Sequence, residues 1–296
     1  MSDSLAKLRR KIDSAADLQS VVRTMKALAA SSIGQYEQSV LALSDYYRTV
    51  ERGLGVCFQQ AASTAGVTAP PATTEHGING IVVFGSDQGL VGQFNDVVTA
   101  HALDTIAKLS GETLVWAAGE RVHACLTEAG ITPAGLFSLP GSVQAITPLV
   151  WDILVQSEQP QGPGRTVTLY LCFNQPVAHT GFAPVSQRLL PLDEAWRRQL
   201  ASQAWPTHNL PEVIGHHDTT LRALIREYLF VSIFRACAES LASENASRLA
   251  AMQRADKNIE AVLDTLNGNF HRLRQNGIDE ELFDVITGFE ALNKKR

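Results

Sequence analysis

Cysteine is scarce in this chain, with only four among 296 residues. Cys57, Cys125, Cys172 and Cys237 lie far apart, and their spacing fits neither a CxxC motif nor a zinc site. The sequence therefore predicts reduced thiols in a cytosolic protein, rather than a disulfide framework or a metal centre. The first residues are polar and no apolar run follows them, so we also expect no export signal.

Proline is missing from both ends of the chain, because none of the twelve prolines occurs before Pro70 or after Pro211. In these two stretches apolar residues recur at steps of three and four, which is the period of one helical face. The N-terminal stripe contains Leu5, Leu8, Ile12, Ala15, Leu18, Val22, Met25 and Leu28. The C-terminal stripe contains Leu221, Leu224, Ile225, Tyr228, Ile259, Val262, Leu266, Phe270 and Leu273. We predict long helices over residues 3–50 and 218–296.

Long uninterrupted apolar runs are also missing, and charged residues break the C-terminal stripe too often for a membrane span. A helix over residues 218–296 would be roughly 110 Å long at 1.5 Å per residue, too long to hide in one globular core. The economical arrangement is an antiparallel coiled coil of the two terminal helices, formed by residues 1–60 and 212–296. The middle of the chain would then be an inserted domain.

The middle of the chain alternates strand-like and helix-like segments. Residues 61–77 are small, polar and proline-containing, as in a linker. Strands are expected at Ile81–Phe84, Thr113–Gly119 and Thr166–Phe173, and helices at Asn95–Leu109, Glu120–Ala129 and Ala145–Glu158. Residues 176–192 look extended, and the pattern from 193 to 218 is weak. The alternation predicts a Rossmann-like α/β domain with a largely parallel sheet over residues 78–192.

Charge is distributed unevenly within the net value of −5. Residues 53–218 contain 6 basic and 13 acidic residues, whereas residues 219–296 contain eleven of each. Such mixed charge at the ends is typical of helices with solvated faces. Since no basic patch is visible, the sequence does not favour nucleic acid as a partner.

Catalytic motifs are missing as well. The segment Gly85-Ser-Asp-Gln-Gly-Leu-Val-Gly92 resembles a phosphate loop, but it lacks both the GxGxxG register and a Gly-Lys-Ser/Thr end. A tight turn with close backbone packing is the favoured explanation of its glycines. Ser86 is not in a GxSxG elbow, and the histidines form no HExxH motif. We identify no catalytic, cofactor-binding or metal-binding residue.

Three stretches together resemble the gamma subunit of F-type ATP synthases, in order and spacing. They are Val21–Ser32 (VVRTMKALAASS), Gly85–Asn95 (GSDQGLVGQFN) and Leu241–Asn258 (LASENASRLAAMQRADKN), the last continuing through HRLRQNGIDEELFDVITGFEAL. The family's fold agrees with the one expected above: an antiparallel coiled coil with a Rossmann-like domain at its foot. The resemblance covers both ends well and the middle loosely.

The resemblance implies a non-catalytic rotor shaft that couples ion flow to the beta-subunit catalytic sites. Its implied partners are the alpha and beta subunits of the head, the epsilon subunit and the ring of c subunits. It implies no cofactor, no nucleic acid and no membrane insertion, and a peripheral place on the cytoplasmic face of a bacterial inner membrane. The asymmetric faces of the shaft would bias each beta subunit between open and closed states.

Several contact residues follow from the resemblance. Arg274 and Gln275 stand where the family's shaft touches the catch loops of the beta subunits. Met25 and Lys26, with Arg248 from the facing helix, stand near a lower contact with a beta subunit. Each also has a plainer interpretation as a solvated helix charge or a packed coiled-coil residue.

The resemblance also implies a turn in the foot that contains Gly85, Asp87, Gly89 and Gly92. Val91 replaces the family's usual cysteine in this turn.

The C-terminal tip contains a conflict between two local signals. Asn276-Gly277 ordinarily indicates a turn, but apolar residues resume at three- and four-residue steps at Ile278, Leu282, Val285 and Phe289. We therefore predict one continuous helix through Gly277, with Phe289 turned toward surrounding subunits.

Three alternatives stay open. The chain departs from the family over Trp205–Pro211, and such divergence also fits an alternative ATPase of the same type, driven by protons or by sodium. An enzyme with a nucleotide-binding Rossmann domain and a coiled-coil oligomerisation arm is the second alternative. A coiled-coil adaptor unconnected to ATPases is the third.

Overall fold

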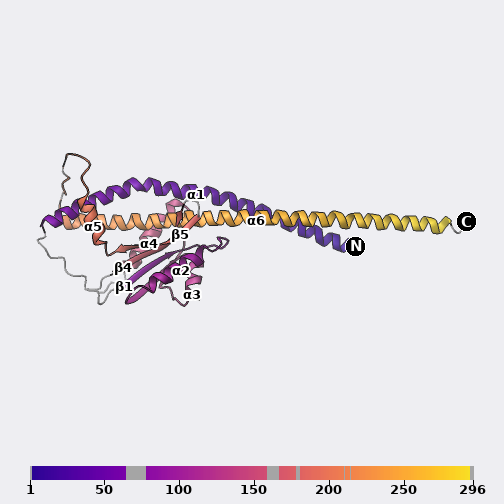
Figure 1. Ribbon diagram of the computed structural model, residues 1–296, viewed down its shortest axis with the longest axis horizontal. Coiled ribbons are helices and arrows are strands. Elements are labelled where there is room, and N and C mark those ends of the chain that lie inside the picture. The colour runs from indigo at the N-terminus through magenta and orange to yellow at the C-terminus, as the bar shows by residue number, and fades with distance from the viewer. Residues whose placement is uncertain are drawn as a thin grey trace. The chain divides into compact units, whose positions relative to one another are not determined.

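The computed structural model describes residues 2–64, 78–158, 167–177, 181–209, 211–213 and 215–293. The chain forms two compact units, which are described separately. Unit 1 contains residues 1–29 and 249–296, and unit 2 contains residues 30–248. Two long helices, α1 (Ser2–Thr64) and α6 (His217–Asn293), contribute to both units (Figure 1).

Both long helices predicted from the sequence are present. Helix α1 continues fourteen residues beyond the expected end at residue 50, and its last turn enters the segment 61–77 that we predicted as a linker. The rest of that segment lies outside the described residues. Part of the extension packs into unit 2, where Leu54 and Cys57 are almost fully covered. Helix α6 is continuous through Gly277, as predicted.

Unit 1 is an antiparallel pair formed by the first part of α1 and the last part of α6. The inward stripe differs from the prediction at several positions. Leu18, Leu28 and Val262 are more than half exposed, whereas Ala29 and Met252 are buried. The period was right, but which of two neighbouring residues faces the partner helix depends on the exact helical phase.

Helix α6 is longer than α1 within unit 1. It contributes residues 249–293, whereas α1 contributes residues 2–29, a difference of 45 − 28 = 17 residues. At 1.5 Å per residue the excess is about 25 Å of helix. Several large apolar side chains are exposed in the last part of α6, namely Ile278, Leu282, Phe283, Val285 and Ile286. The side chain of Phe289 lies outside the described residues.

Unit 2 contains a five-stranded sheet in the order β3-β2-β1-β4-β5. The strands are β1 (Ile78–Phe84), β2 (Glu112–Ala118), β3 (Gly135–Phe137), β4 (Val167–Val177) and β5 (Gly181–Leu190). The first four are parallel, and β5 pairs with β4 in the antiparallel direction. Buried aliphatic residues fill β1, as expected for a strand covered on both faces. The predicted fold class is confirmed.

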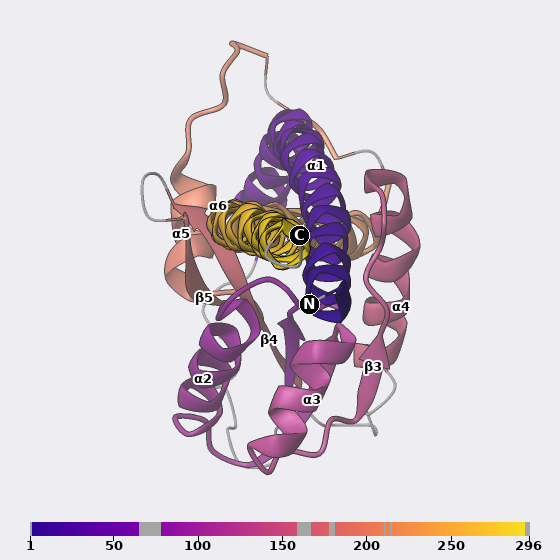
Figure 2. The same cartoon turned by 90° about the vertical axis from the view of Figure 1, so that its right-hand side faces the viewer.

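Helices cover both faces of this sheet (Figure 2). Helices α2 (Phe94–Ile106) and α3 (Glu120–Glu128) pack on one face, around Ile81 and Val83. Helix α4 (Ile146–Glu158), which follows a short 3₁₀ turn η1 (Val143–Ala145), packs on the other face together with α6, around Val82 and Phe84. Alternate side chains of β1 therefore pack into two separate hydrophobic cores, one on each face of the sheet.

A third core lies between α1, α6 and α5 (Glu194–Ser202). The Trp196 ring of α5 lies 4.8 Å from the Tyr228 ring of α6, measured between centroids. The sequence pattern is weak here, because α5 is short and buries only Leu200 fully. Asp193 was the available signal, since its side chain caps the helix by accepting from the Ala195 backbone N–H.

The other predicted elements are present with small shifts at their ends. The three helices expected in the middle of the chain are α2, α3 and α4, and their ends differ from prediction by at most three residues. Strands β1 and β4 are longer than predicted, and β3 was missed. Gly130 lies directly after the C-cap of α3 and has φ +86°, a conformation that favours glycine. All four cysteines are free, as predicted.

Candidate functional site

The turn between β1 and α2, residues 85–93, contains the glycines singled out from the sequence. A Cβ atom on Gly85 would lie 2.3 Å from the Cβ of Val122 and 2.7 Å from the Oδ1 of Asn95. Only glycine therefore lets the end of β1 approach α2 and α3 this closely. Gly89 is less constrained, because its nearest neighbour would be the Arg121 guanidinium at 3.2 Å.

Polar atoms of the turn bond to the chain itself. The backbone N–H of Ser86 donates to Asn95 Oδ1 at 3.0 Å, and Asn95 Nδ2 donates back to Ser86 Oγ at 2.9 Å. The Asp87 carboxylate accepts from the backbone N–H of Glu120 at 3.1 Å and from that of Leu139 at 2.9 Å. Asp87 thus joins the turn to the start of α3, where a negative charge is favourable.

The second half of the turn connects to α6. Leu90 and Gly92 have φ values of +64° and +59°, a region that non-glycine residues seldom adopt. Their conformation buries Val91 between them and leaves Leu90 exposed. The Val91 carbonyl accepts from Ser247 Oγ at 2.5 Å. The turn is therefore part of the packing between the sheet and α6.

The strand order changes direction between β1 and β4, which is where open α/β sheets bind ligands. In this chain, protein atoms occupy the carboxyl ends of these two strands. The buried Asn174 side chain of β4 donates to the Phe94 carbonyl at 2.9 Å, and the Ser86–Asn95 pair lies at the end of β1. This packing disfavours the alternative of a dinucleotide-binding enzyme.

Arg248 is largely buried rather than a solvated surface charge. Its Nη2 lies 2.6 Å from Glu244 Oε1, and the two side chains are only 13% and 8% exposed. Burial raises the pKa of Glu244 above its ordinary value, the Arg248 guanidinium opposes that shift, and the Asp87 charge adds to it. The Nε of Arg248 has no hydrogen-bond partner among the described residues.

Arg248 and Asp87 line the same cavity of about 230 Å³ in unit 2. Residues of α1 and α6 and of two loops surround it, among them Ser32, Tyr36, Pro140 and Glu244. The Tyr36 hydroxyl points across to the Pro140 carbonyl at 3.5 Å, and burial raises the pKa of this phenol. The fold therefore brings together two residues that the sequence had placed in separate sites.

Met25 and Lys26 lie in unit 1 and are both half-buried. Lys26 Nζ contacts Asp256 Oδ2 of α6 at 3.3 Å. The expected meeting of Met25 and Lys26 with Arg248 stays a prediction, because Arg248 belongs to unit 2.

Arg274 and Gln275 are exposed on the part of α6 that belongs to unit 1. Among the described residues, Arg274 has no ion-pair partner. A free guanidinium and a carboxamide are available here to an external acceptor. Their role as a contact with a beta subunit stays a prediction.

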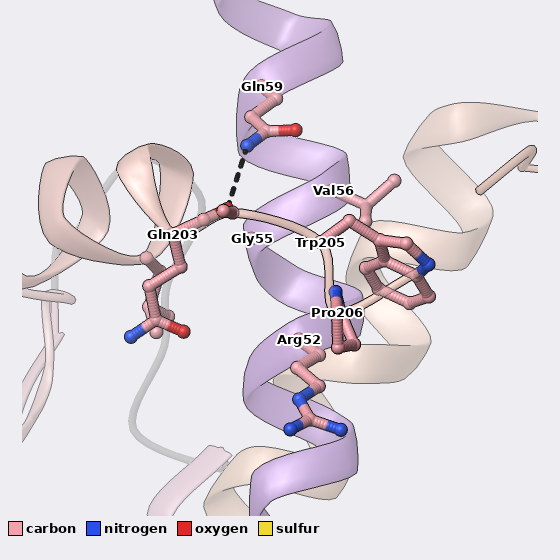
Figure 3. Close-up of a pocket in the computed structure, with 9 residues that line it drawn as sticks. Arg52, Gly55, Val56, Gln59, Gln203, Trp205 and Pro206 are labelled. Carbon is pink, nitrogen blue, oxygen red and sulfur yellow. Dashed lines mark hydrogen bonds between the residues drawn. The ribbon is translucent and has the colours of Figure 1, made fainter. Parts of the chain in front are cut away.

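A second cavity, of about 220 Å³, lies in unit 2 between α1 and the loop after α5 (Figure 3). The side chains of Arg52, Val56 and Gln59 come from α1, and Trp205 and Pro206 come from the loop. Gln59 Nε2 donates to the Ala201 carbonyl at 2.5 Å. This is the segment in which the sequence departs from the family pattern, but sequence reasoning did not predict a cavity there.

A serine–histidine contact was also missed. Ser186 Oγ of β5 lies 2.9 Å from His101 Nε2 of α2 and 2.7 Å from Thr105 Oγ1. Nucleophilic catalysis would need a third group to orient the histidine. Among the described residues no carboxylate bonds to His101, and the Ser186 hydroxyl is shared with Thr105 and Cys172. The cluster joins α2 to β5.

Metal-binding and membrane-spanning features were sought in the described parts of the chain. No group of three or more His, Cys, Asp or Glu side chains is placed to hold a metal ion there. No described helix combines the length and the apolar character needed to cross a bilayer.

The family model described as ATP synthase matches residues 4–292, nearly the whole chain. Curated relatives over the same length carry the name ATP synthase gamma chain. The one from Sorangium cellulosum is 26% identical over 98% of this chain and 99% of its own, and that from Granulibacter bethesdensis is 27% identical over the same shares. The chain belongs to the ATP synthase gamma family.

Solved structures similar to this gamma-family chain share its fold. A chain of the Euglena gracilis mitochondrial ATP synthase, in a structure of the OSCP, F1 and c-ring, aligns with a TM-score of 0.60 and 13% identity, covering 99% of this chain and 95% of its own. A chain from the central stalk and c-ring of the Tetrahymena thermophila enzyme aligns with a TM-score of 0.55 and 19% identity, covering 79% of this chain and 99% of its own. The gamma fold is thus found with little sequence identity.

Proposed function

We propose that this chain is the central-stalk rotor subunit of a rotary ATPase. The observation that carries the proposal is the family match over residues 4–292, which includes both long helices as well as the α/β part. The shape of unit 1 supports the proposal, because α6 is longer than α1 by about 25 Å within this unit. Large apolar side chains are exposed in the last part of α6. Apolar side chains on a helix without a partner need another protein surface to cover them.

The partners follow from the same assignment. Alpha and beta subunits would surround the exposed part of α6, with Arg274 and Gln275 facing the beta subunits. Met25 and Lys26 would form a lower contact with a beta subunit. The epsilon subunit and the c ring would bind at unit 2. The subunit would then lie peripherally on the cytoplasmic face of the membrane, and protons or sodium ions would drive it.

The subunit itself would not be catalytic. Phosphoryl transfer needs a lysine that cradles the phosphates and carboxylates that hold Mg²⁺. In the turn that most resembles a phosphate loop, Asp87 accepts from two backbone N–H groups, and Ser86 is bonded to Asn95. These groups hold the fold together. Coupling would instead come from contacts that differ between the states of the beta subunit.

Reconstitution with the alpha and beta subunits of the same ATPase tests this proposal. We expect the chain alone to turn over no ATP and the three-component assembly to hydrolyse ATP continuously. For rotation, Lys108→Cys at an exposed position in the turn after α2 supplies an attachment point for a bead, while the head is immobilised. Unidirectional, ATP-dependent rotation supports the rotor assignment. ATP turnover by the isolated chain, or an active assembly in which the bead never rotates, would overturn it.

A further inference from the structure

Three side chains of α1 converge on one carboxylate of α6 in unit 1. Gln19 Nε2 and Arg23 Nε lie 3.3 and 3.2 Å from Asp256 Oδ1, and Lys26 Nζ lies 3.3 Å from Asp256 Oδ2. The Asp256 side chain is only 16% exposed, whereas those of Arg23 and Lys26 are 59% and 40% exposed. The acid is thus enclosed by the helix pair, and the two cations lie at its edge.

The helical period explains why these residues meet. Positions 19, 23 and 26 are four and three residues apart, so they share one face of α1. Asp256 lies on the face of α6 that carries the buried Met252, and it therefore points at α1. A carboxylate in such a seam is unfavourable unless it is paired and hydrogen-bonded. Burial acts to raise the pKa of Asp256, but the bonds from Lys26 and Arg23 outweigh it and lower that pKa below its ordinary value.

The cluster also limits the charge that this surface offers. Two cations and one anion leave a net charge of +1, where Arg23 and Lys26 alone would present +2. The surface therefore fits a segment that carries a carboxylate, and only one positive charge is left for it.

We propose that Asp256 is a positioning residue that holds Arg23 and Lys26 against α6 and halves the positive charge they offer to a partner subunit. The partner is an acidic segment of the head, so this part rests on the proposed function. Asp256 touches no partner itself and acts through the two cations. Because Asp256 lowers the net charge of the site to +1, the acidic segment binds weakly enough to dissociate. A site with a charge of +2 would hold the same segment more tightly.

The first test uses the chain alone and does not depend on the proposed function. Acetic anhydride labels lysine amines, and mass spectrometry after digestion gives the labelling rate of each. In Asp256→Asn we expect Lys26 to react about two- to fivefold faster, the range that an exposed ion pair of this kind allows. Asp256→Glu should restore the slow rate. Asp264→Asn, at an exposed position of the same helix, is the matched control and should change nothing.

Lys11, on the exposed part of α1 in unit 1, separates positioning from loosening of the helix pair. A general loosening would raise the labelling of Lys11 and Lys26 together. An unchanged rate at Lys26 in Asp256→Asn, or an equal rise at both lysines, would overturn the proposal.

The second test measures the partner contact by titrating the chain with the alpha–beta assembly. At 20 mM NaCl we expect Asp256→Asn to bind about two- to fivefold more tightly than the wild type and Asp264→Asn. The difference should vanish at 0.5 M NaCl, where exposed charges are screened. Equal or weaker binding of Asp256→Asn at low salt would overturn the partner part. If the wild type itself does not bind, the proposed function fails, whereas the labelling result still decides the role of Asp256 within the chain.

Discussion

Gly85 shows how a single missing Cβ determines the packing of a turn. Gly85→Ala would force an atom to within 2.3 Å of Val122 Cβ, so neighbouring backbone must shift. We expect a loss of about 1–3 kcal/mol in the free energy of unfolding, measured by urea denaturation. Gly34→Ala in α1 is the matched control in unit 2, since its Cβ would meet nothing within 4 Å. The control should gain about 0.5–1 kcal/mol. Equal effects of the two substitutions would contradict this explanation.

Glu244 shows how burial makes stability depend on pH at the residue scale. Its pKa in the folded state is raised above the ordinary value of 4.5, chiefly by burial. Between the unfolded and folded pKa values the native state therefore binds more protons, so this residue's contribution falls as pH rises above about 4.5. In Glu244→Gln we expect that fall to disappear, although the variant is less stable overall because Arg248 loses its partner.

Unfolding free energies measured between pH 4 and 7 test this prediction. The wild-type curve should decline relative to the Glu244→Gln curve as pH rises through this range. Glu260→Gln, at an exposed position of α6, is the control and should run parallel to the wild type. If the Glu244→Gln curve ran parallel to the wild-type curve, the predicted rise in the pKa of Glu244 would be contradicted.

At the scale of one element, α6 shows that a helix can continue through an Asn-Gly pair, which ordinarily indicates a turn. The helix continues through Gly277, which is half-buried, and the apolar side chains beyond it are exposed. Gly277→Pro removes a backbone donor and clashes with the preceding turn, at about 3 kcal/mol or more. We expect it to lower the helical circular dichroism signal and to impair assembly or rotation.

Gly277→Ala is the control for that substitution. It should leave assembly intact and stiffen the tip, because alanine is favoured over glycine in a helix by about 1 kcal/mol. A Pro variant with unchanged helicity, assembly and torque would contradict the prediction.

At the scale of the whole molecule, the sequence predicted that residues 78–192 fold as a separable domain. The compact unit in the structure is larger, because residues 30–64 and 217–248 of the long helices belong to it. One face of the sheet is covered by α4 together with α6, including Ile233 and Cys237. Without α6 that face would be open to water.

We therefore expect residues 78–192 alone to bind a hydrophobic dye and to unfold without a cooperative transition. The segment 30–248 contains the complete core, and we expect it to unfold cooperatively. Urea denaturation followed by tryptophan fluorescence compares the two. Cooperative unfolding of 78–192 at the stability of 30–248 would show that the domain is independent of the shaft helices.

The sequence by itself determined the long helices and the alternating α/β part. These follow from patterns within a few residues: the three- and four-residue steps, the absence of proline and the short aliphatic runs. The continuity of α6 through Gly277 was predictable for the same reason, since the stripe resumed beyond it. Short elements with few buried residues, β3 and α5, were missed because their local signal is weak.

Only the tertiary structure decided what the singled-out residues do. Asp87 is bonded to backbone groups 33 and 52 residues away, and Asp256 meets side chains 230 to 237 residues away. Arg248 was predicted as a contact residue, yet most of it is buried against Glu244. A local pattern fixes which face of a helix a charge lies on. Whether that charge stays free depends on which distant element covers the face, and the packing of the whole chain determines this.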